Sequence, residues 1–381
     1  MNKILINIIT LLLAFSSVLI LYTTNKSKIL NNFNKSENFE KNILKTKSLQ
    51  NDLESGKIVI FGSSELGNKS HKFIPQNYFN KELNLPITVN GHAGHQSFAI
   101  LSQLASYQNK KVINNARVVI FLSPGWFHHR WSKGTALESF LEYMYSDMMY
   151  KLYFESNVDN YYKTLIGKYI KKHISKMKNP SYIYKNAINY NNFTILDKII
   201  YKDILNNIFS NENIKKVKYQ NPKLNFDKLY FEAQDLEAKK VTTNKWGIND
   251  SYYTKYIEPY ILKKQAPPYA IVPPLLGDNQ EFIDFKNLVK ILKKYKIKPL
   301  FIMQDFNPYI YVQNRESIYP LFKDIKKMIK DNGFAYFDMW SYNKNNYELG
   351  TLTDIMHTGE LGWVKINQKI IEHFMKDKRD E

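Results

Sequence analysis

The 381-residue sequence contains no cysteine. Disulfide bonds, zinc sites made of cysteine thiolates and cysteine nucleophiles are therefore excluded. A chain without cysteine is compatible with export from the cytoplasm but does not require it.

Acidic residues are scarce relative to basic ones. The chain has 35 Asp and Glu against 54 Lys and Arg, a formal net charge of +19. A field of this sign attracts anionic partners. Nucleic acid is disfavoured because the N-terminus carries a membrane signal, so we expect an anionic lipid or an anionic cell-wall polymer. The alternative is a coding bias toward Lys, Asn, Ile and Tyr, in which the lysines only solvate the surface.

Charge is also absent from a long apolar run near the N-terminus, from Ile4 to Tyr22. A helix of roughly 20 residues at about 1.5 Å each spans the core of a bilayer, and Tyr22 stands where an interfacial aromatic residue is expected. Residues Ala14 to Ser16 faintly resemble a signal-peptide cleavage site, but the apolar run continues to Leu21. We therefore expect an uncleaved transmembrane anchor over residues 1–23.

Residues 24–53 are polar and rich in Asn and Lys, which predicts a stalk or surface helix. Lys26, Lys28 and Lys35 on this side of the anchor outnumber Lys3 on the other. By the positive-inside rule, this excess of lysines places the large domain in the cytoplasm. The positive-inside rule is weak for long translocated domains, so the lysines leave the orientation open.

Buried strands are expected at residues 58–61, 85–90 and 118–122, each followed by a loop with Gly, Ser or His. A helix from Phe98 to Tyr107 separates the second strand from the third. This alternation predicts an α/β fold with a parallel sheet and helices on its faces. In such sheets, functional sites form at the carboxyl ends of the strands.

The α/β pattern is interrupted between about residues 130 and 280, where helical spacing predicts a large, mainly helical insertion. It then resumes with a helix at 281–295, a strand at 298–303, a helix at 316–331, a strand at 334–338 and a closing helix at 363–375. The expected catalytic domain therefore covers residues 54–381 and contains the insertion.

Two segments far apart in the chain carry candidate catalytic residues. The first strand ends at Gly62-Ser63-Ser64, and Asp354-Ile355-Met356-His357 precedes the last helix. A serine hydroxyl becomes a nucleophile when a base takes its proton, and an imidazole oriented by a carboxylate is such a base. Each motif alone is typical of turns and loops. Their order and placement favour a Ser-His-Asp hydrolase or acyltransferase site.

Several motifs resemble those of known families. Gly62-Ser63-Ser64-Glu65, Gly91-His92-Ala93-Gly94 and Asp354-Ile355-Met356-His357 look like the first, second and last blocks of the SGNH/GDSL hydrolase superfamily. The resemblance is narrower to the DltD family, whose members act in the D-alanylation of teichoic acids. It rests on the anchor, Phe61–Leu66, Gly94–Ser97, Ser123–Phe127 and the run Asp354-x-x-His357-x-Gly359-x-x-Gly362-Trp363.

The resemblance implies a three-layer, flavodoxin-like SGNH-hydrolase fold on the extracellular side of the cell membrane, and this decides the orientation question. It makes Ser64 the nucleophile, His357 its base and Asp354 the orienting carboxylate, with Ser63 in the aspartate position of Gly-Asp-Ser. Gly94 matches the glycine whose N–H helps hold the oxyanion, where losing one donor typically costs about 10²–10³ in rate. The implied partners are the teichoic acid polymer, a membrane-bound O-acyltransferase and a D-alanyl carrier protein.

One block departs from the wider superfamily. The SGNH pattern has an asparagine after the third strand, where this chain has Ser123-Pro124-Gly125-Trp126. A backbone N–H or the Trp126 Nε1–H can substitute for the asparagine as the second oxyanion donor.

Other polar residues near predicted strand ends have less specific meanings. His92, His95, His128 and His129 are interpreted as polar lining of the cleft, with His95 in the substrate pocket. They have no carboxylate at a standard zinc spacing, so neither a metal nor another cofactor is expected. Asp305, Asn307 and Tyr309 either contact substrate or form a plain turn.

The sequence thus predicts an anchored enzyme that transfers a D-alanyl group to hydroxyls of a teichoic acid through an acyl-Ser64 intermediate. One alternative is an esterase or O-acetyltransferase that uses the same three residues on another wall polysaccharide. The other is a non-catalytic scaffold that binds teichoic acid or the acyltransferase.

Overall fold

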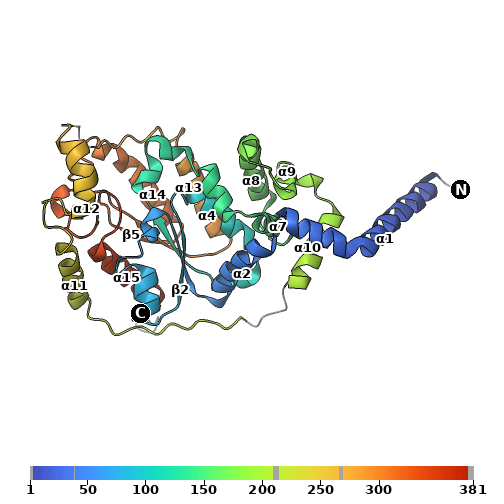
Figure 1. Ribbon diagram of the computed structural model, residues 1–381, viewed down its shortest axis with the longest axis horizontal. Coiled ribbons are helices and arrows are strands. Elements are labelled where there is room, and N and C mark those ends of the chain that lie inside the picture. Colours follow the sequence, from blue (N-terminus) through green and yellow to red (C-terminus); the bar gives the residue numbers. More distant parts are fainter. Residues whose placement is uncertain (1–2, 38, 209–213, 266–268, 376–381) are drawn as a thin grey trace. The chain divides into compact units, whose positions relative to one another are not determined.

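A computed structural model describes residues 3–37, 39–208, 214–265 and 269–375 (Figure 1). The chain divides into two compact units. Residues 1–47 and 145–213 form the first, and residues 48–144 and 214–381 form the second. The second unit contains the sheet and every candidate catalytic residue.

The sheet consists of five parallel strands in the order β2-β1-β3-β4-β5. Their bounds are Ile58–Gly62 for β1, Ile87–Gly91 for β2, Arg117–Leu122 for β3, Leu300–Met303 for β4 and Ala335–Asp338 for β5. This is the strand order of flavodoxin-like folds, which bind ligands at the carboxyl edge beside the first strand. The predicted α/β, flavodoxin-like fold is confirmed.

Helices cover both faces of the sheet in the second unit (Figure 1). On one face, the ring of Trp363 in α15 (Glu360–Phe374) lies 5.8 Å from that of Phe121 in β3. On the other, Phe285 in α13 (Gln280–Lys294) packs against Phe301 in β4, with 5.9 Å between the rings. Because side chains of a strand alternate between faces, apolar runs such as Ile58–Phe61 bury residues against both layers.

The second unit contains further helices besides α13 and α15. They are α3 (Pro75–Asn77), α4 (Ser97–Ser106), α5 (Lys110–Asn115), α6 (Leu137–Tyr143), α11 (Phe226–Ala238), α12 (Asp250–Tyr252) and α14 (Tyr319–Asp331). The π-helical segments are Tyr78–Glu82 and Tyr253–Leu262, and the 3₁₀ turn η1 (Ser64–Gly67) directly follows β1.

The regular elements of the first unit, within its described residues, are all helices joined by short turns. This unit contains α1 (Lys3–Glu37), α7 (Ser146–Phe154), α8 (Asn160–His173), α9 (Tyr182–Ala187) and α10 (Ile195–Ile208), while α2 (Phe39–Ser55) crosses into the second unit. The large insertion expected between 130 and 280 is mainly helical, as predicted, but its residues are shared between the two units.

Helix α1 continues well beyond the apolar run that predicts a membrane anchor. Within the described residues, Lys3–Asn32 is the one segment long and apolar enough to span a membrane. An 18-residue window of this segment has a mean hydropathy of 2.7, and none of that window is buried. The hydroxyl of Tyr22 donates to Asp203 Oδ2 over 2.7 Å, and Lys26 Nζ lies 2.9 Å from the same oxygen. These contacts hold the polar half of α1 against α10. The helix continues to Glu37, so the first part of the expected stalk after residue 23 is helical.

Candidate active site

Ser64 stands at the carboxyl edge of the sheet because β1 ends abruptly at two paired glycines. Gly62 pairs with Gly91 of β2. A Cβ atom on Gly91 would lie 2.6 Å from the carbonyl oxygen of Gly62, and one on Gly62 would lie 2.7 Å from Leu66 Cδ1. Such contacts are too short for any side chain, so glycine at both positions lets the chain turn tightly into η1 and present Ser64.

His357 and Asp354 lie on a closed loop before α15. Leu352 and Thr358 form an isolated antiparallel bridge at its base, and the Thr353 N–H donates to the carbonyl of His357 over 2.9 Å. Oδ1 of Asp354 accepts the backbone N–H groups of Met356 and His357, each over 2.8 Å. These bonds orient the carboxylate and leave its second oxygen for the imidazole.

Asp354, His357 and Ser64 form one hydrogen-bonded chain. Nδ1 of His357 lies 2.7 Å from Asp354 Oδ2, and Nε2 lies 3.1 Å from Ser64 Oγ. With the proton on Nδ1 donated to the carboxylate, Nε2 is free to accept the serine proton. Both distances are within the reach required of a general base and its orienting group. The structure thus joins two segments 293 residues apart.

Of the two strand-end residues Asp305 and Asn307, Asn307 holds this loop, whereas Asp305 forms a buried ion pair. The Asn307 N–H donates to the carbonyl of Ile355 over 2.9 Å, and Asn307 Nδ2 donates to the carbonyl of Trp246 over 2.9 Å. Asp305 is buried and pairs with Arg315, with 2.8 Å between the nearest atoms. The sequence left open whether these residues contact substrate or only form a turn. The contacts of Asp305 and Asn307 are those of a structural turn.

Glu65 is a buried carboxylate next to the nucleophile. Its Oε1 accepts the backbone N–H of Ser63 over 2.5 Å. Burial raises the pKa of Glu65, and the hydrogen bonds from backbone N–H groups only partly oppose this. Burial alone lowers the pKa of His357, but its hydrogen bond to Asp354 and the charges of Asp354 and Glu65 outweigh burial and raise it above 6.5.

These electrostatics predict how the reactivity of Ser64 depends on pH. Protonated His357 cannot accept the serine proton, so covalent labelling of Ser64 by a fluorophosphonate probe should rise with pH, with a midpoint above 6.5. In Glu65→Gln the amide oxygen can still accept the Ser63 N–H, but the charge is gone. The midpoint should therefore shift to lower pH. A midpoint that is unchanged or higher in Glu65→Gln contradicts the assigned role of its charge.

Ser64 opens into a cavity of about 320 Å³. Residues from the ends of β1, β2, β3 and β4 and from the His357 loop line it: Ser63, Ser64, Glu65, Ala93, Gly94, Gln96, Ser123, Gly125, Trp126, His128, Trp131, Phe306, Tyr311 and Met356. Of the residues expected in the pocket, Ser63, Gly94 and Trp126 are therefore brought to it. Its volume is in the range of pockets that bind small molecules.

Gly94 has a local role that the sequence does not indicate. Its N–H donates to Ser63 Oγ over 3.0 Å, and its φ of +83° is one that glycine adopts readily. This N–H is thus occupied by the serine next to the nucleophile. It can turn to an oxyanion only if the Ser63 hydroxyl moves.

His95 lies outside this cavity, although the sequence places it in the substrate pocket. It is fully buried, with Nδ1 3.2 Å from the carbonyl oxygen of Gly62 and Nε2 2.9 Å from Gln103 Oε1. Its ring stacks on Tyr143 at 3.7 Å between centroids. Burial lowers the pKa of His95 to about 4, so the ring is neutral and supports the end of β1 from behind.

Of the other candidate histidines, His92 lies apart, whereas His128 and His129 lie together, with 5.1 Å between their ring centroids. His92 is exposed and lies 3.2 Å from Glu142 Oε2, whereas His128 and His129 line a second cavity of about 300 Å³. Burial, with the charge of His129, lowers the pKa of His128 to about 4. Among the described residues, the one His and carboxylate group compact enough for a metal contains none of these histidines.

Aromatic residues that the sequence does not single out form the wall between the two cavities. Trp131 and Tyr311, with His128, line both cavities. Phe306 stacks on Tyr311 at 4.3 Å between ring centroids. Phe306 follows a strand end, and this position is a signal that could have found it. Trp131 stands in a 3₁₀ turn (His129–Lys133) and Tyr311 in an irregular segment, so no long periodic pattern marks them.

Comparison with known proteins gives a consistent result. A family model described as "DltD protein" matches residues 32–375. The chain is 23% identical to Protein DltD of Staphylococcus aureus (strain NCTC 8325 / PS 47) over 360 residues, which cover 89% of this chain and 87% of that protein. It is 26% identical to Protein DltD of Bacillus subtilis (strain 168) over 345 residues, or 84% and 82% of the two chains.

Proposed function

Because the chain belongs to the DltD family, we propose that it acts in the D-alanylation of teichoic acid as a serine acyltransferase. The observation that carries the catalytic part is the hydrogen-bonded chain from Asp354 through His357 to Ser64, at 2.7 and 3.1 Å. A hydroxyl, a base and an orienting carboxylate in this order are the groups that acyl transfer through a covalent intermediate needs.

The first half-reaction forms the acyl-enzyme. His357 Nε2 takes the proton of Ser64 while Oγ attacks the carbonyl carbon of a D-alanyl ester or thioester. As the tetrahedral intermediate collapses, the bond to the donor's oxygen or sulfur breaks. The departing group takes the proton from His357. D-Alanine is then esterified to Ser64.

The second half-reaction transfers the acyl group to the polymer. A polymer hydroxyl gives its proton to His357 and attacks the ester carbon, and Ser64 Oγ leaves with that proton. The Ser64 backbone N–H, at the first position of η1, stabilises the oxyanion in both steps, because the first N–H groups of a helix lack intrahelical acceptors. Trp126, from the loop after β3, lines the same cavity and is a candidate for the second donor. The N–H of its neighbour Gly125 already donates to Ser123 Oγ over 3.3 Å.

The aromatic cavity supports transfer over hydrolysis. Trp131, Tyr311 and the neutral His128 separate the cavity at Ser64 from the second one. Apolar walls keep water from the ester, and two adjoining cavities of about 300 Å³ can receive acyl group and acceptor side by side.

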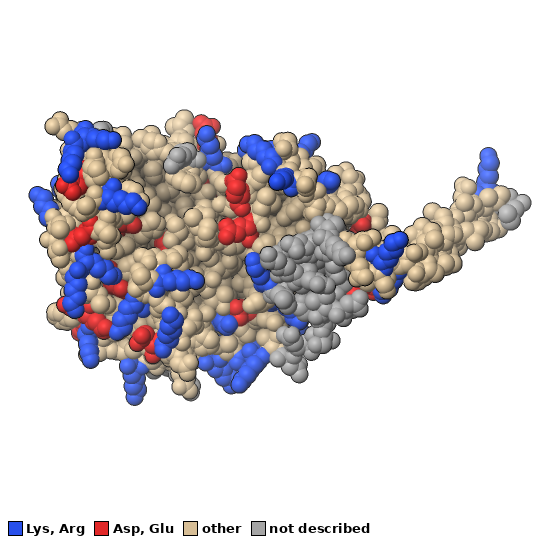
Figure 2. All heavy atoms as spheres, viewed as in Figure 1, with Lys and Arg blue, Asp and Glu red and all other residues tan. Residues whose placement is uncertain are grey.

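The net charge of the chain supports an anionic acceptor. Figure 2 shows Lys and Arg spread over the described part of one face, with Asp and Glu among them. The net charge of +19 thus acts as a general attraction for a poly(glycerol- or ribitol-phosphate) chain. We infer that α1 anchors the protein in the cell membrane with the catalytic unit outside. A membrane-bound O-acyltransferase and a D-alanyl carrier protein are its partners in supplying the acyl group.

Deletion and complementation test the proposed pathway. Mass spectrometry of wall polymer should find D-alanine esters strongly reduced in a deletion strain and restored by the full-length chain. Unchanged D-alanine with altered O-acetylation would instead support an esterase or O-acetyltransferase on another polysaccharide. A wall in which neither modification changes would contradict both enzymatic functions.

A further inference from the structure

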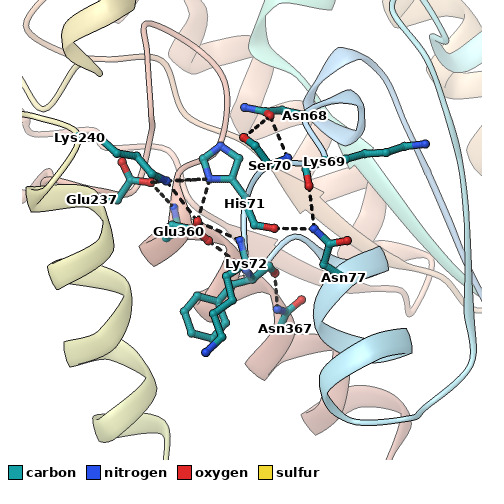
Figure 3. A network of polar contacts seen from close by, with 11 residues as sticks. Asn68, Lys69, Ser70, His71, Lys72, Asn77, Glu237, Lys240, Glu360 and Asn367 are labelled. Carbon is teal, nitrogen blue, oxygen red and sulfur yellow. Dashed lines mark hydrogen bonds and ion pairs between the residues drawn. The ribbon is translucent and has the colours of Figure 1, made fainter.

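Four polar side chains, His71, Glu237, Lys240 and Glu360, form a mostly buried cluster next to the candidate active site (Figure 3). His71, Glu237 and Glu360 are each at most 3% exposed. The side chain of Lys240 is partly exposed and reaches the cluster from the surface. The four residues come from three segments: the loop after η1, the end of α11 with the turn that follows, and the start of α15. Burying two carboxylates is costly unless they are paired and hydrogen-bonded.

Glu360 fastens the loop that follows the nucleophile. Its Oε1 accepts the Lys72 N–H over 3.0 Å, and its Oε2 accepts the Phe73 N–H over 2.9 Å. His71 Nδ1 lies 3.3 Å from Glu360 Oε1. Nε2 of His71 is buried and has no hydrogen-bond partner within the described chain. The ring proton therefore belongs on Nδ1, where it is donated to Glu360.

Glu237 fastens the first turn of α15 to α11. Its Oε1 accepts the backbone N–H of Glu360 over 2.9 Å. Lys240 Nζ then bridges the two carboxylates, 3.2 Å from Glu237 Oε1 and 3.2 Å from Glu360 Oε1. Burial raises the pKa of Glu360, but the bonds from His71 and Phe73 and the charge of Lys240 lower it to about 2. Glu360 therefore stays ionised at neutral pH.

The cluster has the donor set of a metal site, but the chain supplies its own cation. One donor atom each from His71, Glu237 and Glu360 lie within 4.8 Å of one another. The ammonium of Lys240 lies 3.2 Å from both carboxylates and 3.5 Å from His71 Nδ1. It therefore stands where a divalent cation would bind and supplies a positive charge to both carboxylates.

This network lies on the same chain segments as Ser64 and His357. Glu360 is three residues after His357, and the loop that it binds, Lys72 and Phe73, is in the segment that continues from Ser64 and η1. Asn367 of α15 adds a bond from Nδ2 to the carbonyl of Phe73 over 2.7 Å. The segments that carry base and nucleophile are thus joined by a second set of hydrogen bonds, in addition to the 3.1 Å contact of His357 Nε2 with Ser64 Oγ.

We propose that Glu360 and Lys240 are positioning residues that hold the His357 loop against the Ser64 turn and so set the distance between base and nucleophile. The proposal rests on the proposed function, in that Ser64 and His357 are taken to react. Misplacing a catalytic group by about 1 Å can cost about 10²-fold in rate. Loosening the network should therefore slow the chemical step at Ser64 without changing what the cavity binds.

The test measures the reaction of Ser64 with a fluorophosphonate probe on the full chain in detergent. In this reaction Ser64 Oγ bonds to phosphorus, fluoride leaves and the serine proton passes to His357, so no natural substrate is needed. Glu360→Gln and Lys240→Met should lower the rate of the covalent step about 10- to 100-fold, with probe affinity changed less than about twofold. Lys240→Arg, which keeps the cation, should recover most of the rate.

Lys239→Met is the matched control, because Lys239 is the adjacent residue and its ion pair with Asp235 is exposed. Active-site titration gives the folded fraction of each variant, so that partial unfolding is not counted as slow chemistry. If folded Glu360→Gln and Lys240→Met react as fast as Lys239→Met, the positioning role is wrong. If instead the unmodified protein is not labelled, or Ser64→Ala is labelled equally, the proposed function fails and not this inference alone.

Discussion

Ser64→Ala should abolish D-alanyl transfer, lowering the rate about 10⁴-fold or more. Without the nucleophile, only binding and oxyanion stabilisation remain to accelerate the reaction. The change removes one hydroxyl from a partly exposed turn, so the fold should be retained. The measurement is the D-alanine content of wall polymer in a deletion strain complemented with the variant, together with fluorophosphonate labelling of the purified chain.

Ser63→Ala is the matched control, since the two serines are adjacent and only one touches His357. Ser63 Oγ accepts the N–H of Gly94 over 3.0 Å. Its removal frees that N–H for an oxyanion or a water, and the rate should change by no more than about 10-fold, less than the loss of an oxyanion donor. Full activity of Ser64→Ala would leave the scaffold as the surviving function. Loss of activity in Ser63→Ala alone would move the nucleophile to the other serine.

Asp354→Asn should reduce the rate about 10⁴-fold with little change in folding. An amide can still accept the N–H groups of Met356 and His357 at one atom, so the loop is held. It no longer carries the charge that raises the pKa of His357, and it can present an N–H to Nδ1, which favours the wrong imidazole tautomer. In serine hydrolases the equivalent change has an effect of about this size. Steady-state transfer rates and the pH profile of Ser64 labelling measure both consequences.

Asp338→Asn serves as the control for a carboxylate at a strand end. Asp338 ends β5 and pairs with Lys326, whose Nζ is 3.2 Å from Oδ2. This position is outside the cavity at Ser64, so the variant should keep the transfer rate of the unmodified chain. Equal losses in Asp338→Asn and Asp354→Asn would show that general destabilisation, and not the imidazole, is responsible.

The histidine, serine and aspartate are the part of the site that local patterns predict well. An apolar, β-branched run that ends in glycine has few interpretations other than a buried strand with a turn at its end. This brings Ser64 to the carboxyl edge of a parallel sheet. The three-residue spacing of Asp354 and His357 lets a short loop bring both side chains together. Their distance of 2.7 Å follows from local geometry.

The surroundings of these residues could not be predicted in the same way. His95 follows a strand end just as Gly94 does, yet its ring turns inward to stack on Tyr143. Whether a side chain after a strand faces the cavity or the core depends on which helix packs behind it. Trp131 reaches the cavity from a short 3₁₀ turn and Tyr311 from an irregular segment. Their positions depend on contacts between residues far apart in the chain.

The sequence by itself determined the strands along the chain and the apolar N-terminal helix, because these depend on short-range periodicity. Its motifs also indicated the candidate serine, histidine and aspartate, with Ser64 chosen over Ser63 by the resemblance to Gly-Asp-Ser. Only the tertiary structure decided that Gly94 donates to Ser63, that the helical insertion is shared between two units, and that Lys240 fills the place of a cation between Glu237 and Glu360. The contact of Lys240 with Glu360 joins residues 120 positions apart in the chain. Long-range packing selects such pairings among many that local sequence permits equally.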